Sequence, residues 1–130
     1  MICGKKNWII PDCELPPEGE GALKGHESVI VVNDSKKTAH IKVKLFFVDK
    51  DAYEGIEWTV EPGRVKCFRM NNPADMSGYI VEKETQYAMK LESDTRIVVQ
   101  YGRLDNRQTD RKSTRLNSSH SRVSRMPSSA

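Results

Sequence analysis

The chain has 130 residues, a formal net charge of +3 and a mean hydropathy of −0.64. It contains no run of about 20 apolar residues that could span a bilayer, and its first residues lack the apolar segment of a secretion signal. Its three cysteines are odd in number and form no Cys-x-x-Cys pair, which argues against a zinc site or a redox dithiol. We therefore expect a cytoplasmic protein with reduced thiols, no metal and no cofactor.

The composition changes abruptly near residue 110. Residues 110–130 are rich in Ser and Arg and nearly free of large apolar side chains, which is typical of disorder. Back-translated, residues 110–120 and 124–130 resemble the two constant parts of a common sequencing adapter, and residues 121–123 fall where its variable index would lie. We interpret residues 110–130 as a non-native, disordered tail from adapter readthrough and exclude them from functional reasoning.

This interpretation changes the charge argument. The tail carries five of the 21 Lys and Arg residues and one of the 18 Asp and Glu residues, so residues 1–109 hold 16 basic and 17 acidic side chains, a net charge of −1. The sequence pI of 8.8 then comes from the tail. Nucleic-acid binding cannot be inferred from the overall charge. Residues 1–109 have the size of one domain with a single core.

In chain order, this domain reads as a series of short strands. Apolar and polar residues alternate most clearly in Ile41–Phe47, where one face is apolar and the other mostly polar. Two segments break the pattern: Glu14–Gly25, rich in Pro and Gly, predicts a long loop, and Ala74–Gly78 predicts at most one helical turn. Strands are predicted at Val29–Val32, Ile41–Phe47, Ile56–Val60, Arg64–Met70, Tyr79–Val81, Tyr87–Leu91 and Ile97–Gln100.

Turn signals between these segments indicate the fold class. Glu61-Pro62-Gly63 predicts a tight turn into Arg64–Met70, consistent with a hairpin, because Pro fixes φ and Gly permits positive φ. About seven or eight short strands with a turn signal roughly every 8–12 residues favour an antiparallel arrangement. We therefore predict an all-β single domain, an antiparallel β-sandwich with a jelly-roll-like arrangement.

The densest group of chemically specific side chains follows the apolar run Ile97–Val99. Two guanidinium groups, a carboxylate and a carboxamide lie between residues 103 and 108. If the strand continues, Arg103 and Asp105 share a face and can form an ion pair. Two interpretations remain open: a network that fixes the strand end or an interface, and a site that recognises a polar ligand. The candidate residues are Arg103, Asp105, Arg107 and Gln108.

His26 and Glu27 are adjacent at the start of a predicted strand, so their side chains point to opposite faces and cannot form one catalytic dyad. His26 either bonds a loop carbonyl or lines a pocket. Among the aromatic residues, Trp58 alternates with core positions and is expected in the core. Trp8 could belong to the core or stack on a sugar ring, and Tyr101 could also stack on a sugar ring. No nucleophile and base occur at a recognised spacing, so we expect no enzyme.

The segment IVVQYGRLDNRQ, residues 97–108, resembles the C-terminal motif of the soluble sensory rhodopsin transducer family. Weaker resemblances to the same family follow in the correct order along residues 8–108. Two positions depart from the family pattern: Tyr101 stands where His is frequent, and Arg96 replaces a Pro. The weaker matches are Trp8 with Ile10-Pro11, His26-Glu27, Asp49, Val60–Arg64, and Arg69–Asn71 with Pro73.

The resemblance implies a β-sandwich related in shape to carbohydrate-binding modules and assembled as a homotetramer. It also implies a signalling protein that binds the cytoplasmic face of a sensory rhodopsin or another signalling protein. The alternatives are a module for a small polar, carbohydrate-like ligand and a DNA-binding regulator, the latter supported locally only by Arg64, Lys66 and Arg69. The predicted ligand- or partner-binding residues are Trp8, His26, Glu27, Asn71, Arg103, Asp105, Arg107 and Gln108.

Overall fold

A computed structural model describes residues 2–17 and 25–104 and the backbone of residues 121–124. These residues form seven strands and no helix, so none of them belongs to a helix long and apolar enough to span a membrane. The predicted all-β antiparallel sandwich is confirmed. The strands are β1 (Lys5–Glu14), β2 (His26–Asn33), β3 (Ala39–Phe47), β4 (Tyr53–Val60), β5 (Arg64–Arg69), β6 (Gln86–Leu104) and β7 (Ser121–Ser124).

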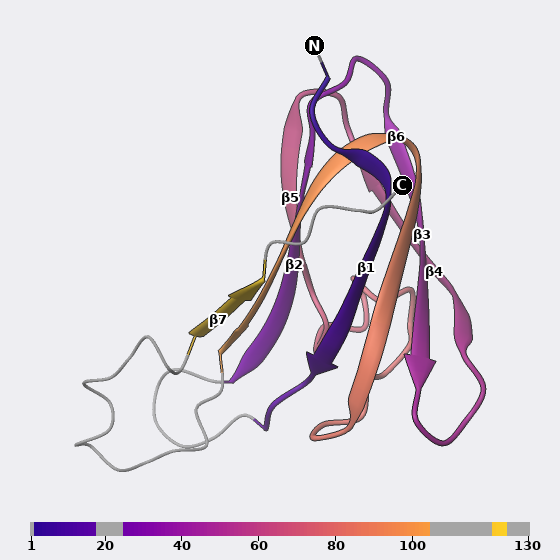
Figure 1. Cartoon of the computed structure of the whole chain (residues 1–130), viewed down its shortest axis with the longest axis vertical. Helices are drawn as coiled ribbons and strands as arrows, with labels where there is room; N and C mark the ends of the chain where they lie inside the picture. Colours follow the sequence, from indigo (N-terminus) through magenta and orange to yellow (C-terminus); the bar gives the residue numbers. More distant parts are fainter. Residues whose placement is uncertain (1, 18–24, 105–120, 125–130) are drawn as a thin grey trace.

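The long strand β6 belongs to both layers of the sandwich. Its first half pairs with β1 and β3, and its second half pairs with β2, so the strand order runs β4-β3-β6-β2-β5. Figure 1 shows β6 arching over one end of the molecule between the two layers. The sequence predicted two separate strands here, because Glu92-Ser93-Asp94 reads as a polar break. This prediction is wrong: the polar residues lie where the strand bends.

The core lies between the layers and is formed mainly by alternate residues of β1–β4 and β6, as the period-2 pattern requires, with Phe68 from β5. Ile41, Val43 and Leu45 of β3 are each 2 % exposed or less. Trp58 is buried as predicted, and its ring stacks on Phe68 of β5 at a centroid distance of 4.1 Å. This contact joins the two outermost strands across the layers.

Strands β4 and β5 are joined by the predicted tight turn but do not form a hairpin. Gly63 has φ +66 and the Arg64 amide donates to the Glu61 carbonyl, as the sequence suggested. However, β4 pairs with β3 whereas β5 pairs with β2. The Gly63 amide donates to the carbonyl of Asn33, the last residue of β2, at 2.9 Å. The chain therefore passes after the turn from the layer that contains β4 to the layer that contains β2.

Three further segments differ from the prediction. Strand β1 was not predicted, because Pro11 interrupts its pattern; the structure places Pro11 at a register shift between Ile10 and Cys13, where no ladder bond is needed. Residues 79–81 form no strand; Tyr79 instead stacks on Tyr53 at 4.2 Å and covers the core. Residues 74–78 form consecutive turns rather than one helical turn.

The tail was expected to be disordered, yet the structure places Ser121–Ser124 as strand β7. It pairs antiparallel with residues 101–104 of β6. For these four residues the expectation of disorder is contradicted. The physical reason is that a strand edge binds through backbone amides and carbonyls, which a polar, low-complexity segment also possesses. The remaining tail residues lie outside the described part of the chain.

Candidate functional site

Two predicted site residues, Glu27 and Arg103, face each other in the structure. Glu27 of β2 is directly opposite Arg103 of β6 in the strand register, so both side chains point into the space between the layers. Glu27 is fully buried and Arg103 is 8 % exposed. His26 lies opposite Leu104 and is half-buried, which agrees with the expectation that it points away from Glu27.

The Glu27 carboxylate accepts hydrogen bonds from three donors. The Tyr87 hydroxyl donates to Oε1 at 2.5 Å, the Tyr101 hydroxyl donates to Oε2, and the Glu14 amide donates to Oε2 at 2.8 Å. Because Tyr87 and Tyr101 come from the two halves of β6, the carboxylate ties both layers together. We call Glu14, Glu27, Tyr87, Tyr101 and Arg103 the Glu27 cluster.

Arg103 lies at one end of this cluster, and one nitrogen of its guanidinium group makes no hydrogen bond to any other described residue. Its Nη1 is 3.8 Å from Oε1 of Glu14 and is fully buried. Within the described residues this nitrogen has no hydrogen-bond partner. A buried charged donor without an acceptor is costly, so this end of the cluster is the point at which a further acceptor would be stabilising.

Burial sets the protonation states of the cluster. Burial raises the pKa of Glu27, while hydrogen bonds from Tyr101, Tyr87 and the Glu14 amide and the charge of Arg103 oppose that rise. Burial also raises the pKa of both tyrosines, and the nearby Glu27 charge adds to the effect. The hydroxyls therefore remain protonated and act as hydrogen-bond donors.

Cys13 lies beside the cluster as a buried thiol. Burial raises the pKa of Cys13, and the charge of Glu27 raises it further. A thiol held in its protonated form is a poor nucleophile and a poor metal ligand. Among the residues that the structure describes, no group of three His, Cys, Asp or Glu side chains could hold a metal ion.

The other predicted residues are not all brought together. Asn71 follows β5 and is exposed; its neighbour Met70 donates its amide to the Glu27 carbonyl, so Asn71 lies at the same end of the sandwich as the cluster. Trp8 is buried, and its indole donates to the carbonyls of Lys5 and Ile97 near the opposite end. Asp105, Arg107 and Gln108 lie outside the described residues.

The tyrosines were missed as members of the site. Tyr101 was considered only as a surface for sugar stacking, but it is 2 % exposed and has no free face. Tyr87 was treated as part of a short strand. The available signal was the spacing of Tyr101 and Arg103, which share a strand face with each other. Their common partner Glu27 is 74 positions away from Tyr101 in sequence, so only strand pairing reveals it.

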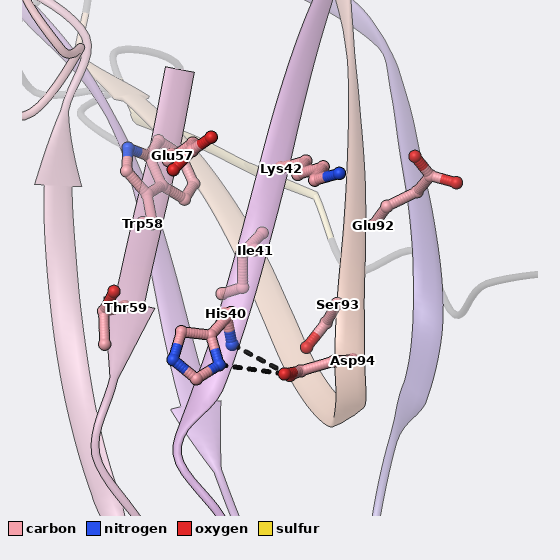
Figure 2. Close-up of a pocket in the computed structure, with 9 residues that line it drawn as sticks. All are labelled: His40, Ile41, Lys42, Glu57, Trp58, Thr59, Glu92, Ser93 and Asp94. Atoms are coloured by element: carbon pink, nitrogen blue, oxygen red, sulfur yellow. Dashed lines mark hydrogen bonds and ion pairs between the residues drawn. The ribbon is translucent and has the colours of Figure 1, made fainter. Parts of the chain in front are cut away.

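A second feature that the sequence did not predict is an open groove of about 410 Å³ on the outer face of β4, β3 and β6 (Figure 2). His40 and Asp94 meet at one end: the His40 amide donates to Oδ1 at 2.9 Å, and Nδ1 lies 2.8 Å from Oδ2. The backbone and side-chain bonds from His40 lower the pKa of Asp94. Farther along, Lys42 lies between Glu57 and Glu92 in the strand register.

A family model and solved structures match this chain. A family model described as Anabaena sensory rhodopsin transducer matches residues 3–119. The crystal structure of Thermotoga maritima 1070 superposes with a TM-score of 0.78 over 95% of this chain and 93% of that one, at 23% identity, a likeness of fold alone. The Anabaena sensory rhodopsin transducer superposes with a TM-score of 0.68 at 27% identity, over 78% of this chain and 96% of that one. A comparison with curated protein sequences finds no match.

Proposed function

Because the chain belongs to the Anabaena sensory rhodopsin transducer family, we propose that it is a non-enzymatic, cytoplasmic signal-transduction protein that binds a partner protein through one end of its sandwich. This end is where β1 and β6 finish and β2 begins. It holds Glu14, His26, Arg103 and Asn71, and the predicted residues Asp105, Arg107 and Gln108 follow directly in the chain. The partner suggested by the family is the cytoplasmic face of a sensory rhodopsin.

One observation carries this location: the buried Nη1 of Arg103 has no acceptor among the described residues. Glu27, in contrast, already accepts three hydrogen bonds. A carboxylate or a carbonyl brought by a partner would satisfy this donor. Partner binding would then be transmitted through Glu27 to both halves of β6.

Titration calorimetry with detergent-solubilised Anabaena sensory rhodopsin tests the proposal. We expect Arg103→Gln to weaken binding at least about tenfold, since a charge-assisted hydrogen bond contributes about 1.5–3 kcal/mol. Lys90→Gln is the matched control, because Lys90 is a cation on the outer face of the first half of β6 and does not belong to the cluster. Equal losses in both variants, or no binding by the unaltered chain, would contradict the proposal.

The expected homotetramer belongs to the same proposal. It is supported by family membership and by a row of apolar side chains on the outer face of β6, β2 and β5, where Val98, Val32 and Val65 are neighbours in register and all exposed. Exposed apolar rows of this kind favour protein contacts. Light scattering at micromolar concentration measures the assembly, and a monomer would contradict it.

A small-polar-ligand module remains a second candidate because of the groove in Figure 2. The groove presents carboxylates, a lysine and a histidine on one open face, which suits a hydroxyl-rich ligand. The aromatic stacking originally expected for a carbohydrate has no support here, since Trp8, Trp58 and Tyr101 are all buried. Chemical-shift changes of His40 and Thr59 during titration with neutral sugars would test this candidate, and unchanged shifts at millimolar sugar would contradict it.

The DNA-binding alternative has the least support. Arg64, Lys66 and Arg69 are exposed on β5, but Lys66 packs over the ring of Phe68 with Nζ 5.3 Å from its centroid. Three cations on one short strand neutralise few phosphates. A measured affinity for duplex DNA that falls steeply with salt, and that is lost in Arg64→Ala, would favour this alternative.

A further inference from the structure

A second cavity lies at the other end of the sandwich, away from the Glu27 cluster. It has a volume of about 480 Å³ and is formed by the N-terminal segment, the loop between β2 and β3, and the bend of β6. Four cationic side chains line it: Lys6, Lys36, Lys37 and Arg96. We call this cavity the loop pocket. None of its lining residues belongs to the partner-binding end proposed above.

The two acids that line the loop pocket are already engaged elsewhere. Asp34 Oδ2 accepts the Cys3 amide at 3.1 Å. Both carboxylate oxygens of Asp94 are occupied by the amide and the ring of His40, the contact drawn in Figure 2. In the part of the chain that the structure describes, none of the four cations forms an ion pair. With four cations against two acids, the lining carries a formal net charge of +2, and its cations come from three separate segments.

The loop that carries Lys36 and Lys37 is held in a fixed conformation by two buried polar residues. The Asn33 side-chain amide donates to the carbonyls of Lys37 at 2.7 Å and Val60 at 3.0 Å. Its Oδ1 accepts from the Ser35 amide at 2.9 Å, and the Ser35 hydroxyl in turn accepts from the Lys37 amide at 3.2 Å. Asn33 is fully buried and Ser35 is 5 % exposed. Such a loop presents its cations without a backbone ordering cost on binding.

We propose that the loop pocket binds a small phosphate-bearing anion. The guanidinium of Arg96 can hold two phosphate oxygens at once, and the lysine ammonium groups add point charges. The cavity has the size of a small-molecule site, about 300–1,000 Å³, and its cations surround a concavity rather than extending along a flat face. This favours a compact phosphate over a peptide or an extended nucleic acid. The inference is independent of the partner proposed above.

Calorimetric titration of the full chain with inorganic pyrophosphate, at matched ionic strength, tests this site. We expect saturable binding, and an affinity loss of at least about tenfold in both Lys36→Ala/Lys37→Ala and Arg96→Ala. These side chains are exposed, so the variants keep the fold. The matched control is Lys42→Ala/Lys90→Ala, which removes the same charge from the outer face of β3 and β6. Because every variant retains the basic tail, differences between them report the pocket alone.

The outcomes distinguish the sources of the phosphate group. A lipid headgroup is tested by comparing vesicles of phosphatidylcholine with phosphatidic acid against vesicles of phosphatidylcholine alone. If the chain binds both pyrophosphate and the phosphatidic acid vesicles, and the same substitutions weaken both, the headgroup is a ligand. Binding to pyrophosphate alone identifies a soluble phosphate compound. No binding to pyrophosphate, an equal loss in the Lys42→Ala/Lys90→Ala control, or binding only to a poly-glutamate peptide would overturn the proposal.

Discussion

Glu27 illustrates at the scale of a single residue how a buried acid is accommodated. Its carboxylate has no exposure to solvent and replaces water with two tyrosine hydroxyls and one backbone amide. A buried acceptor that loses one of these donors loses more free energy than a surface group would, because no water replaces the donor. The cluster should therefore respond strongly to changes as small as one hydroxyl.

Removing either tyrosine hydroxyl should destabilise the fold. We expect Tyr87→Phe and Tyr101→Phe each to lower the free energy of unfolding by about 1.5–3 kcal/mol, the range for hydrogen bonds to a charged group. Urea denaturation measures the change. Tyr79→Phe is the control, because the Tyr79 ring is only partly buried and contacts Tyr53 and Phe47 through its ring. Losses below about 0.5 kcal/mol in both cluster variants would mean that the hydroxyls are not bonded to Glu27.

The pH dependence of stability should reveal Glu27 directly. Since the pKa of Glu27 in the folded state is raised above its usual value of 4.5, the folded protein binds more protons than the unfolded chain as pH rises past that value. Stability is therefore lost as pH rises through the folded-state pKa. In Glu27→Gln this loss is absent, so the stability of the variant relative to the original chain should increase with pH.

Denaturation at a series of pH values from 4 upward measures this difference for Glu27→Gln. Asp75→Asn serves as a control, since the Asp75 carboxylate lies outside the cluster and accepts the Arg69 amide. A relative stability of Glu27→Gln that stays constant, or falls as pH rises, would show that the hydrogen bonds and Arg103 outweigh burial.

At the scale of elements, β6 determines the architecture because its two halves belong to different layers. The bend brings Ile97 against the N-terminal segment, and Gly4 makes this close approach possible. Gly4 has φ +100, and a Cβ at this position would lie 2.1 Å from the Ile97 carbonyl oxygen. The N-terminal segment can therefore pass over β6 only without a side chain at position 4.

Gly4→Ala should be more destabilising than Gly78→Ala, although both glycines have a similar positive φ. Gly78 is the matched control, because its φ is +88 but a Cβ would meet nothing within 4 Å. We expect Gly78→Ala to cost about 1–2 kcal/mol from strain alone, and Gly4→Ala to cost at least about 1 kcal/mol more from the additional clash. Thermal or urea denaturation compares them. Equal losses would mean that the N-terminal segment moves away from β6 without cost.

Local sequence patterns were sufficient to predict some of the strands but not all of them. Alternation correctly predicted β3 and β4, because each presents one face to the core and one to solvent. The apolar run at residues 29–32 predicted β2, and the turn at Pro62-Gly63 predicted where β5 begins. It failed for β1, where Pro11 hides the strand, and for residues 79–81, where Tyr79 and Val81 cover the core without forming a ladder. A buried segment need not be a strand, because a strand forms only where its backbone makes ladder hydrogen bonds to a neighbouring strand.

At the scale of the whole molecule, the boundary near residue 109 remains a prediction. The family match extends to residue 119, and β7 places residues 121–124 on the edge of β6. Neither observation bears on the origin of the tail. The four residues of β7 pair with the end of β6, whereas the buried core residues come from β1–β6 and neighbouring segments such as Met70–Val81.

Removal of residues 110–130 should therefore leave the sandwich intact. We expect the free energy of unfolding to change by less than about 1 kcal/mol, because β7 adds edge hydrogen bonds that water replaces when the tail is absent. Urea denaturation of residues 1–109 beside the full chain measures the change. A chain of 1–109 that fails to fold, or loses several kcal/mol, would show that the tail is part of the domain.

The sequence by itself determined the strand character and the all-β class and marked Glu27 and Arg103 as candidate site residues, because period-2 alternation and unusual polar residues are local properties. It did not determine that Glu27 and Arg103 face each other, that Tyr87 and Tyr101 share one acceptor, or that four cations from three segments line one cavity. These relations connect residues far apart in the chain. They depend on which strands pair and in what register, and strand pairing is decided by the backbone ladder and the packing of two layers, which only the tertiary structure specifies.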